Sequence, residues 1–146
     1  MKIELKILEI KDLNSLKDLC EICFDIKSDV EIMKKEYKKI LNNPNTKQII
    51  LKLENKIIGH IKYDIINDIF DMGKPYMYLS DLCIHPDYRG NGYSKLLMDY
   101  CEKEAINNNC KNIFLNSSEF RDIAHKLYEG LGYHIRDSRI YRKGLI

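Results

Sequence analysis

A phosphate-binding turn is predicted at residues 89–94, which read Arg89, Gly90, Asn91, Gly92, Tyr93 and Ser94. The residues from Tyr78 to near His85 are rich in strand formers, and Pro86 ends that strand because proline cannot donate a ladder hydrogen bond. After the turn, apolar residues at spacings of three and four predict a helix. The first turn of a helix has backbone N–H groups without partners, and its dipole favours an anion. The glycines let the backbone approach such a ligand, and Arg89 adds a positive charge.

Two nucleotide-binding motifs are excluded at this turn. A Walker A loop needs Gly-Lys followed by Ser or Thr, but Gly92 is followed by Tyr93, Ser94 and Lys95. The dinucleotide fingerprint needs a further glycine three residues after Gly92, where Lys95 stands. A different phosphate ligand is therefore indicated.

The remaining pattern resembles the (Arg/Gln)-x-x-Gly-x-(Gly/Ala) pyrophosphate loop of the GNAT superfamily, the acyl-CoA-dependent N-acetyltransferases. Arg89 and Gly92 match it, and the preceding Ile-His-Pro-Asp-Tyr is similar to the family's usual lead-in. Ser94 stands where the family usually has Gly or Ala, but serine is small and keeps its N–H. The resemblance implies that residues 89–94 bind the pyrophosphate of acetyl-CoA, the co-substrate.

A second block, residues 124–133, is similar to the family's A-x-x-(Leu/Phe)-Tyr-x-x-x-Gly-(Phe/Tyr) block. In the family, the tyrosine of this block lies near the thioester sulfur. The resemblance therefore implies that Tyr128 is the general acid that protonates the leaving thiolate. The alternative interpretation is a packed core tyrosine, since Leu127 and Leu131 are its neighbours.

The strand before the turn supplies further contacts implied by the resemblance. In the family, the pantetheine arm pairs with the backbone of this strand, so Leu82, Cys83 and Ile84 are expected to bind acyl-CoA through main-chain groups. A backbone N–H near Cys83 is the expected donor to the oxyanion. Because the family transfers the acyl group directly, Cys83 is expected to pack rather than to act as a nucleophile.

Asp81 is the expected general base, because some relatives use an acidic residue at this point of the strand. The alternative is a carboxylate that binds the ammonium group of the substrate. Arg121 stands where many relatives have asparagine; it is expected to bind a phosphate of CoA, and the alternative is a solvated cap residue. Asn116, at the end of a predicted strand, is expected to contact the pantetheine.

The composition is that of an ordinary globular protein. The chain has 146 residues, of which 45% are hydrophobic and 32% charged, and its net charge is +2. We therefore expect one domain over residues 1–146 and no nucleic-acid partner. No apolar run reaches the length of a membrane helix, and the start of the chain does not resemble a signal peptide. Relatives in the family are often dimers, so a homodimer is a hypothesis by analogy.

The five cysteines and four histidines form no metal-binding pattern. An odd number of cysteines without an export signal predicts free thiols and a cytoplasmic location. Cys20 and Cys23 form a C-x-x-C on the apolar face of a predicted helix, where a core role is favoured over metal or redox chemistry. No metal site is predicted.

The order of the predicted elements matches that of the family. Strands are predicted at residues 2–10, 48–53, 57–65, 78–85, 111–117, 133–136 and 139–143, the last two forming a hairpin. Helices are predicted at residues 13–24 after Asp12 as N-cap, from a Ser28/Glu31 capping box to Asn42, at 93–107 and at 118–131. The implied fold is α+β with three layers: a mixed, largely antiparallel central sheet flanked by helices, the GNAT acyl-CoA N-acyltransferase fold.

The sequence therefore predicts an enzyme that moves the acetyl group of acetyl-CoA directly onto a primary amine of an unidentified acceptor. One alternative is a non-catalytic acyl-CoA-binding module, which would keep the turn but lack a working acid and base. Another is a nucleotide-binding protein such as a kinase, which the missing Walker A loop disfavours. The acceptor pocket is expected between the first two helices, the loop at 67–75 and the final hairpin.

Overall fold

The structure is a computed structural model that describes residues 2–146. The chain divides after Asn116 into two compact units. We call residues 2–116 the sheet unit and residues 117–146 the C-terminal unit.

The sheet unit contains a five-stranded sheet in the order β1-β2-β3-β4-β5. All neighbouring strands are antiparallel except β4 and β5, which are parallel and are connected through helix α3. The predicted mixed, largely antiparallel sheet is thus confirmed. The strands are β1 (Ile3–Ile7), β2 (Thr46–Leu53), β3 (Lys56–Ile66), β4 (Tyr76–Ile84) and β5 (Ile113–Leu115).

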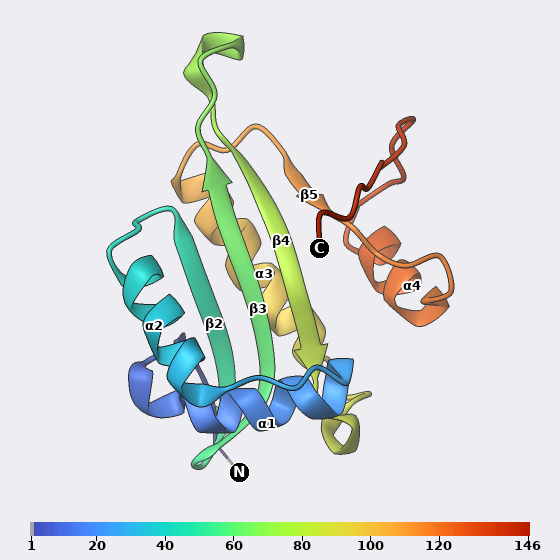
Figure 1. The fold of residues 1–146 in the computed structure, drawn as a ribbon. Helices are drawn as coiled ribbons and strands as arrows, with labels where there is room; N and C mark the ends of the chain where they lie inside the picture. Colours follow the sequence, from blue (N-terminus) through green and yellow to red (C-terminus); the bar gives the residue numbers. More distant parts are fainter. Residues whose placement is uncertain (1) are drawn as a thin grey trace. The chain divides into compact units, whose positions relative to one another are not determined.

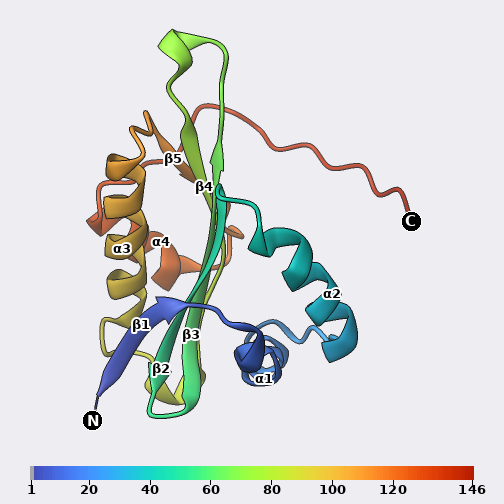
Figure 2. The same cartoon turned by 90° about the vertical axis from the view of Figure 1, so that its left-hand side faces the viewer.

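Helices cover both faces of this sheet. Figure 2 shows α3 (Tyr93–Asn107) on one face, and α1 (Leu13–Phe24) and α2 (Val30–Leu41) on the other. Ile50 lies in a buried cluster with leucines of α1, whereas its strand neighbours Ile49 and Leu51 point to the opposite face. Helix α3 buries Leu97, Met98, Cys101 and Ala105. Residues 49–51 of β2 are therefore apolar and buried on both faces of the sheet, whereas β3 and β4 also carry polar residues such as Lys62 and Ser80.

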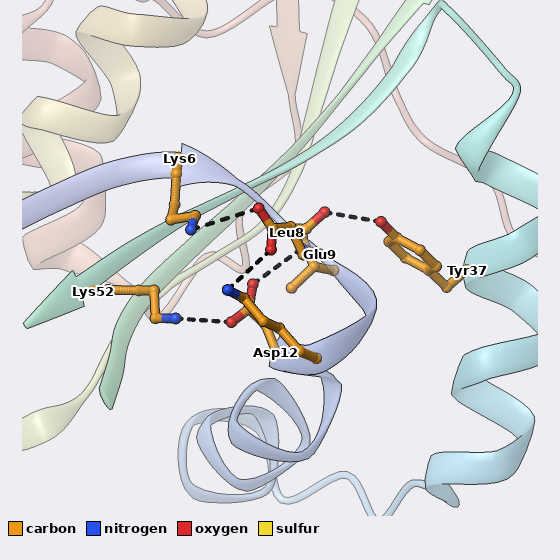
Figure 3. Close-up of polar contacts among 7 residues, drawn as sticks. Lys6, Leu8, Glu9, Asp12, Tyr37 and Lys52 are labelled. Carbon is orange, nitrogen blue, oxygen red and sulfur yellow. Dashed lines mark hydrogen bonds and ion pairs between the residues drawn. The ribbon is translucent and has the colours of Figure 1, made fainter. Parts of the chain in front are cut away.

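A buried ion pair fixes the start of α1 to the sheet (Figure 3). Asp12 occupies the predicted N-cap position, but its side chain makes no capping bond. Instead, its carboxylate accepts hydrogen bonds from Lys52 Nζ at 2.9 Å and from the Glu9 N–H at 3.0 Å. Burial alone would raise the pKa of Asp12, but these two bonds outweigh it and lower the pKa. A second contact connects α2 to the residue after β1: the Tyr37 hydroxyl donates to the Leu8 carbonyl oxygen.

Several predicted boundaries needed correction. The N-cap of α2 is Asp29 and not Ser28, because the Asp29 carboxylate accepts from the N–H groups of Glu31 and Ile32. β1 and β5 are shorter than predicted. In contrast, the ends of α1 and the end of α3 lie at the predicted residues.

The C-terminal unit contains one helix, α4 (Asp122–Gly130). The hairpin predicted at 133–136 and 139–143 is wrong, because residues 131–146 contain no strand. Its apolar side chains Ile135 and Ile140 are exposed, and a two-stranded hairpin without a sheet to pack on is only marginally stable. Within residues 2–146, no helix combines the length and apolar character required to cross a membrane.

Candidate functional site

The central strand β4 has two unlike halves. Met77, Tyr78 and Leu79 pair with β3 on one side and with β5 on the other. Within the described chain, the pairing with β5 ends at Leu79, so residues 80–84 have a strand partner on the β3 side only. We call residues 80–84 the open segment. The free edge of a strand carries main-chain donors and acceptors that can bind an extended ligand.

The open segment contains the residues for which main-chain contacts with acyl-CoA are predicted. These are Leu82, Cys83 and Ile84, of which Cys83 and Ile84 are buried and Leu82 is half-buried. Their side chains therefore pack on the sheet, and the edge offers the backbone. The contact with a ligand stays a prediction.

A β-bulge lies at the start of the open segment. His60 pairs with Cys83 and Lys62 with Ser80, so two residues of β4 lie opposite the single residue Ile61 of β3. Asp81 in this bulge has a φ of 56°, in the left-handed region, and its residue surface is exposed. The bulge turns the Asp81 carboxylate away from the core and leaves it accessible to a substrate.

A buried histidine of β3 holds the bulge. His60 is only 3% exposed, and its Nδ1 lies 2.9 Å from the Asp81 carbonyl oxygen. Its other ring nitrogen contacts the side-chain amide of Gln48 on β2. Burial lowers the pKa of His60 despite the opposing effect of Asp81. A neutral ring donates through Nδ1–H to the Asp81 carbonyl and accepts at Nε2 from the Gln48 side chain, with the amide turned so that its NH2 group faces the ring. Sequence reasoning missed His60; the available signal was one histidine inside an otherwise apolar strand.

Gly59 permits the close approach of β3 to the open segment. It pairs with Ile84, and a Cβ placed on Gly59 would lie 2.8 Å from Ile84 Cδ1 and 3.3 Å from Leu51 Cδ1. A larger residue would therefore displace the Ile84 side chain at the end of β4. This glycine was also missed, and a glycine inside a strand is a recognised sign of such an approach.

The turn after β4 has the conformation of an anion site. Gly90 and Gly92 have φ values of 79° and 78°, which favour glycine, and a Cβ on either would meet nothing within 4 Å. The Asn91 side chain donates to the carbonyls of Tyr88 and Arg89 and so stabilises the turn. Gly92 is the N-cap of α3 and offers no side-chain cap, so the N–H groups of the first turn are left for a ligand.

Arg89 connects this turn to the end of β4. Its Nε donates to the Ile84 carbonyl oxygen at 3.0 Å, and the same oxygen accepts a weak hydrogen bond from Cys23 Sγ of α1 at 3.5 Å. The residue is otherwise exposed. The guanidinium is thus held beside the open segment. Of the predicted residues, Arg89, Gly90, Asn91 and Gly92 form the turn, and Tyr93 and Ser94 are the first residues of α3.

The C-terminal unit contains the predicted acid. Tyr128 is half-buried on α4, and its ring makes an edge contact with the Tyr133 ring, with centroids 6.3 Å apart. Burial raises the pKa of Tyr128 and the Arg121 charge opposes that effect, so the phenol keeps its proton at neutral pH. Arg121 is exposed at the N-cap of α4, and Asn116 is exposed just after β5.

Metal ligands are not gathered anywhere in the described chain. Among residues 2–146, no three His, Cys, Asp or Glu side chains are arranged to hold a metal ion.

Comparison with known proteins identifies a family. The model of the Acetyltransferase (GNAT) family matches residues 13–133. An acetyltransferase of Yersinia pestis (strain Pestoides F) is 35% identical over 65 residues, which cover 44% of this chain and 46% of that relative. The match thus spans about half the length of this curated relative.

Two solved structures share the fold. One is AAC(6')-Iy in complex with a bisubstrate analogue, CoA-S-monomethyl-acetylneamine, with a TM-score of 0.83, 17% identity and 100% of both chains covered. The other is glucosamine-6-phosphate N-acetyltransferase from Arabidopsis thaliana, with a TM-score of 0.83, 15% identity, and 98% of this chain and 99% of that one covered. At these identities the likeness concerns the fold alone.

Proposed function

Because this chain belongs to the GNAT acetyltransferase family, we propose that it transfers the acetyl group of acetyl-CoA directly to a primary amine. The observation that carries the proposal is the open segment, which is followed, after a 3-10 turn at Pro86–Tyr88 and the glycine turn, by an uncapped helix N-terminus. A free strand edge suits the amide-rich pantetheine arm, and the helix N-terminus suits the pyrophosphate. The residues present therefore fit acetyl-CoA. In this proposal both units belong to one acetyltransferase domain, located in the cytoplasm.

Each predicted residue has a distinct role in binding acetyl-CoA. The main-chain groups of Leu82, Cys83 and Ile84 pair with the pantetheine, and the turn at residues 89–94 binds the pyrophosphate. Arg89 adds a positive charge. The hydrogen bond from Arg89 Nε to the Ile84 carbonyl already positions the guanidinium beside the end of β4. Arg121 and Asn116 are secondary contacts, to a phosphate and to the pantetheine. The solved complex of AAC(6')-Iy with a CoA-containing analogue supports this assignment by fold.

The reaction forms a C–N bond and breaks the C–S bond of the thioester. The amine must be neutral to attack, and in our proposal the Asp81 carboxylate takes its proton. A backbone N–H near Cys83 donates to the oxyanion that develops on the carbonyl oxygen. Tyr128 gives its phenolic proton to the leaving sulfur, and its raised pKa keeps that proton available at neutral pH.

Release of free thiol from acetyl-CoA tests the proposal. A panel of polyamines, amino sugars, aminoglycosides, amino acids and peptides is offered to the wild-type protein and to the Tyr128→Phe variant. We expect turnover with one amine class, and a loss of about 10²–10⁴-fold in kcat for Tyr128→Phe, the usual contribution of a general acid. Tyr141→Phe, which changes an exposed tyrosine of the same unit, is the matched control.

Calorimetric titration with CoA separates binding from catalysis. Arg89→Ala should weaken CoA binding, whereas Tyr128→Phe should leave it nearly unchanged. Tight CoA binding without turnover of any amine would favour the non-catalytic acyl-CoA-binding module. Absence of CoA binding would overturn the interpretation of residues 89–94.

A further inference from the structure

The first strand of the sheet has a free edge. β1 pairs with β2 on one side, and within residues 2–146 no strand pairs with its other side. Figure 1 shows β2, β3 and β4 in this order across the sheet, and Figure 2 views the sheet from the end at which β1 lies. Because β2 and β3 separate this edge from the open segment of β4, it is distinct from the proposed acetyl-CoA site.

The main-chain groups at this edge belong to the odd-numbered residues of β1. The Leu8 N–H donates to the Gln48 carbonyl oxygen at 3.0 Å, which continues the β1–β2 register by one pair. Along an antiparallel ladder, hydrogen-bonded pairs alternate with pairs that exchange no hydrogen bonds. The even-numbered residues of β1 are therefore bonded to β2 in the same way as Leu8. The N–H and C=O groups that point to the free edge are those of Ile3, Leu5 and Ile7.

The apolar side chains of β1 are only partly covered. Ile3 and Leu5 are half-buried and Ile7 is 50% exposed, and all three lie on the same face of the sheet. Their neighbours on β2 include Ile49 and Leu51, which are fully buried. The burial of this apolar layer thus decreases at β1, where one further strand would cover it.

The charged side chains of β1 alternate in sign. Lys2, Glu4 and Lys6 follow one another on the opposite face of the strand. Charges on an edge strand commonly prevent pairing with another strand, but alternating signs prevent only the registers that bring like charges together. The ion pairs within the chain, Lys2 with Glu4 at 3.8 Å and Lys6 with Glu9 at 3.7 Å, are long and lie near the surface. They are therefore weak and can be exchanged for others.

We propose that the free edge of β1 binds the β1 edge of a second copy of this chain, antiparallel and with Leu5 opposite Leu5. A two-fold axis then relates the copies, so each contact occurs twice. Ile3 lies opposite Ile7 of the second copy, and all outward main-chain groups of the strand are bonded. Glu4 lies opposite Lys6 of the second copy, so both charged pairs across the interface are opposite in sign.

Charge and length disfavour the other registers that pair odd-numbered residues. A shift of two residues in one direction places Glu4 opposite Glu4 and Lys2 opposite Lys6. The same shift in the other direction places Lys6 opposite Lys6. Like charges directly opposite each other destabilise a strand pair. Registers centred on Ile3 or Ile7 use only the ends of the two strands, so the register centred on Leu5 is favoured.

Two charge reversals test this register. In the Glu4→Lys protein both charged pairs join two positive side chains, and in the Lys6→Glu protein both join two negative side chains. Each variant alone should dimerise at least about tenfold more weakly than the wild type, because two like-charge pairs replace two opposite pairs. An equimolar mixture of the two variants has opposite charges in both pairs, so a heterodimer should form with nearly the wild-type affinity.

Sedimentation velocity of the full chain over a range of concentrations measures the association. Native mass spectrometry with one variant labelled with ¹⁵N identifies the heterodimer. The mixture contains the same two proteins as the separate samples, so its recovery cannot come from a change in the stability of either monomer. Lys74→Glu, the same charge change at an exposed residue between β3 and β4, is the matched control and should dimerise like the wild type.

Hydrogen exchange of single amides, measured by NMR, tests the main-chain pairing. In the mixture, the N–H groups of Ile3, Leu5 and Ile7 should exchange more slowly than in either variant alone. The N–H groups of residues 4 and 6 should change little, because they are bonded to β2 in the monomer as well. CoA binding should be the same in all these variants, since the edge is distinct from the open segment.

Three results would overturn the proposal. One is a wild type that stays monomeric at its highest soluble concentration, which would leave the edge to a strand of another protein. Another is a wild-type dimer that neither charge reversal weakens. The third is a mixture of the two variants that associates no more than its separate components.

Discussion

Residues 76–79 and residues 80–84 belong to the same strand, but their surroundings differ on one side. In the first set, Met77, Tyr78 and Leu79 pair with both β3 and β5, and Met77 and Leu79 are buried in the core. The second set has lost β5, contains a left-handed residue and depends on a histidine of β3 for its shape. One strand thus provides a doubly paired half and a half whose outer edge has no strand partner among the described residues. We expect mutations to separate these two roles.

The largest effect on stability is expected in the doubly paired half. Met77→Ala removes a side chain that is 0% exposed, and should lower the free energy of unfolding by about 2–5 kcal/mol because a cavity remains. CoA affinity of the folded protein should change little. Urea denaturation and calorimetry measure the two quantities. Ile69→Ala, at a side chain 91% exposed, is the control and should stay within about 0.5 kcal/mol.

Two results would contradict the separate roles of the two halves of β4. One is an unchanged free energy of unfolding in Met77→Ala, and the other is loss of CoA binding in Met77→Ala that is still folded. Either result would mean that the two halves of β4 are not separable.

A smaller, pH-dependent effect is expected at His60. Burial lowers its pKa in the folded state, so below about pH 6.5 the unfolded chain binds a proton that the folded chain does not. Stability therefore falls as the pH decreases, by up to about 1.4 kcal/mol per pH unit for this one proton. His60→Gln lacks this pH-dependent contribution. The free energy of unfolding of the wild type should therefore approach that of the variant as the pH decreases from about 7.5 to 5.5.

Urea midpoints at several pH values give this measurement. His134→Gln, which changes an exposed histidine, should show no such narrowing. A constant difference between wild type and His60→Gln would argue that His60 is not held neutral beside the Asp81 carbonyl.

The smallest effect is expected at the bulge itself. Asp81 has a φ of 56°, a conformation that glycine adopts freely and alanine does not. Asp81→Gly should therefore be more stable than Asp81→Ala by about 1 kcal/mol. Both variants lack the carboxylate, so both should lose acetyl transfer equally if Asp81 is the base. Recovery of activity in one variant alone would show that residue 81 matters through the backbone rather than through its proton.

The sequence by itself determined the elements that depend on local patterns. The apolar spacing in α1 and α3, the strand before Pro86 and the glycine turn were all predicted, because periodicity, proline and glycine act on neighbouring residues. The family and the mixed sheet followed from two motifs, residues 89–94 and 124–133. Expectations about the roles of Asp81, Arg121 and Asn116 also came from that resemblance and stay predictions.

Only the tertiary structure decided what depends on contacts between distant residues. The Asp12 side chain does not cap α1, because it forms an ion pair with Lys52 of β2. His60 of β3 forms a hydrogen bond with the Asp81 carbonyl and so stabilises the bulge between β3 and β4. The predicted hairpin at the end of the chain does not form in a unit that gives it no sheet to pack on. Cys20 and Cys23 of α1 pack against the core cluster that contains Cys83 of β4. Spacing along the chain could not show this, because Cys20 and Cys23 lie on α1 whereas Cys83 lies on β4.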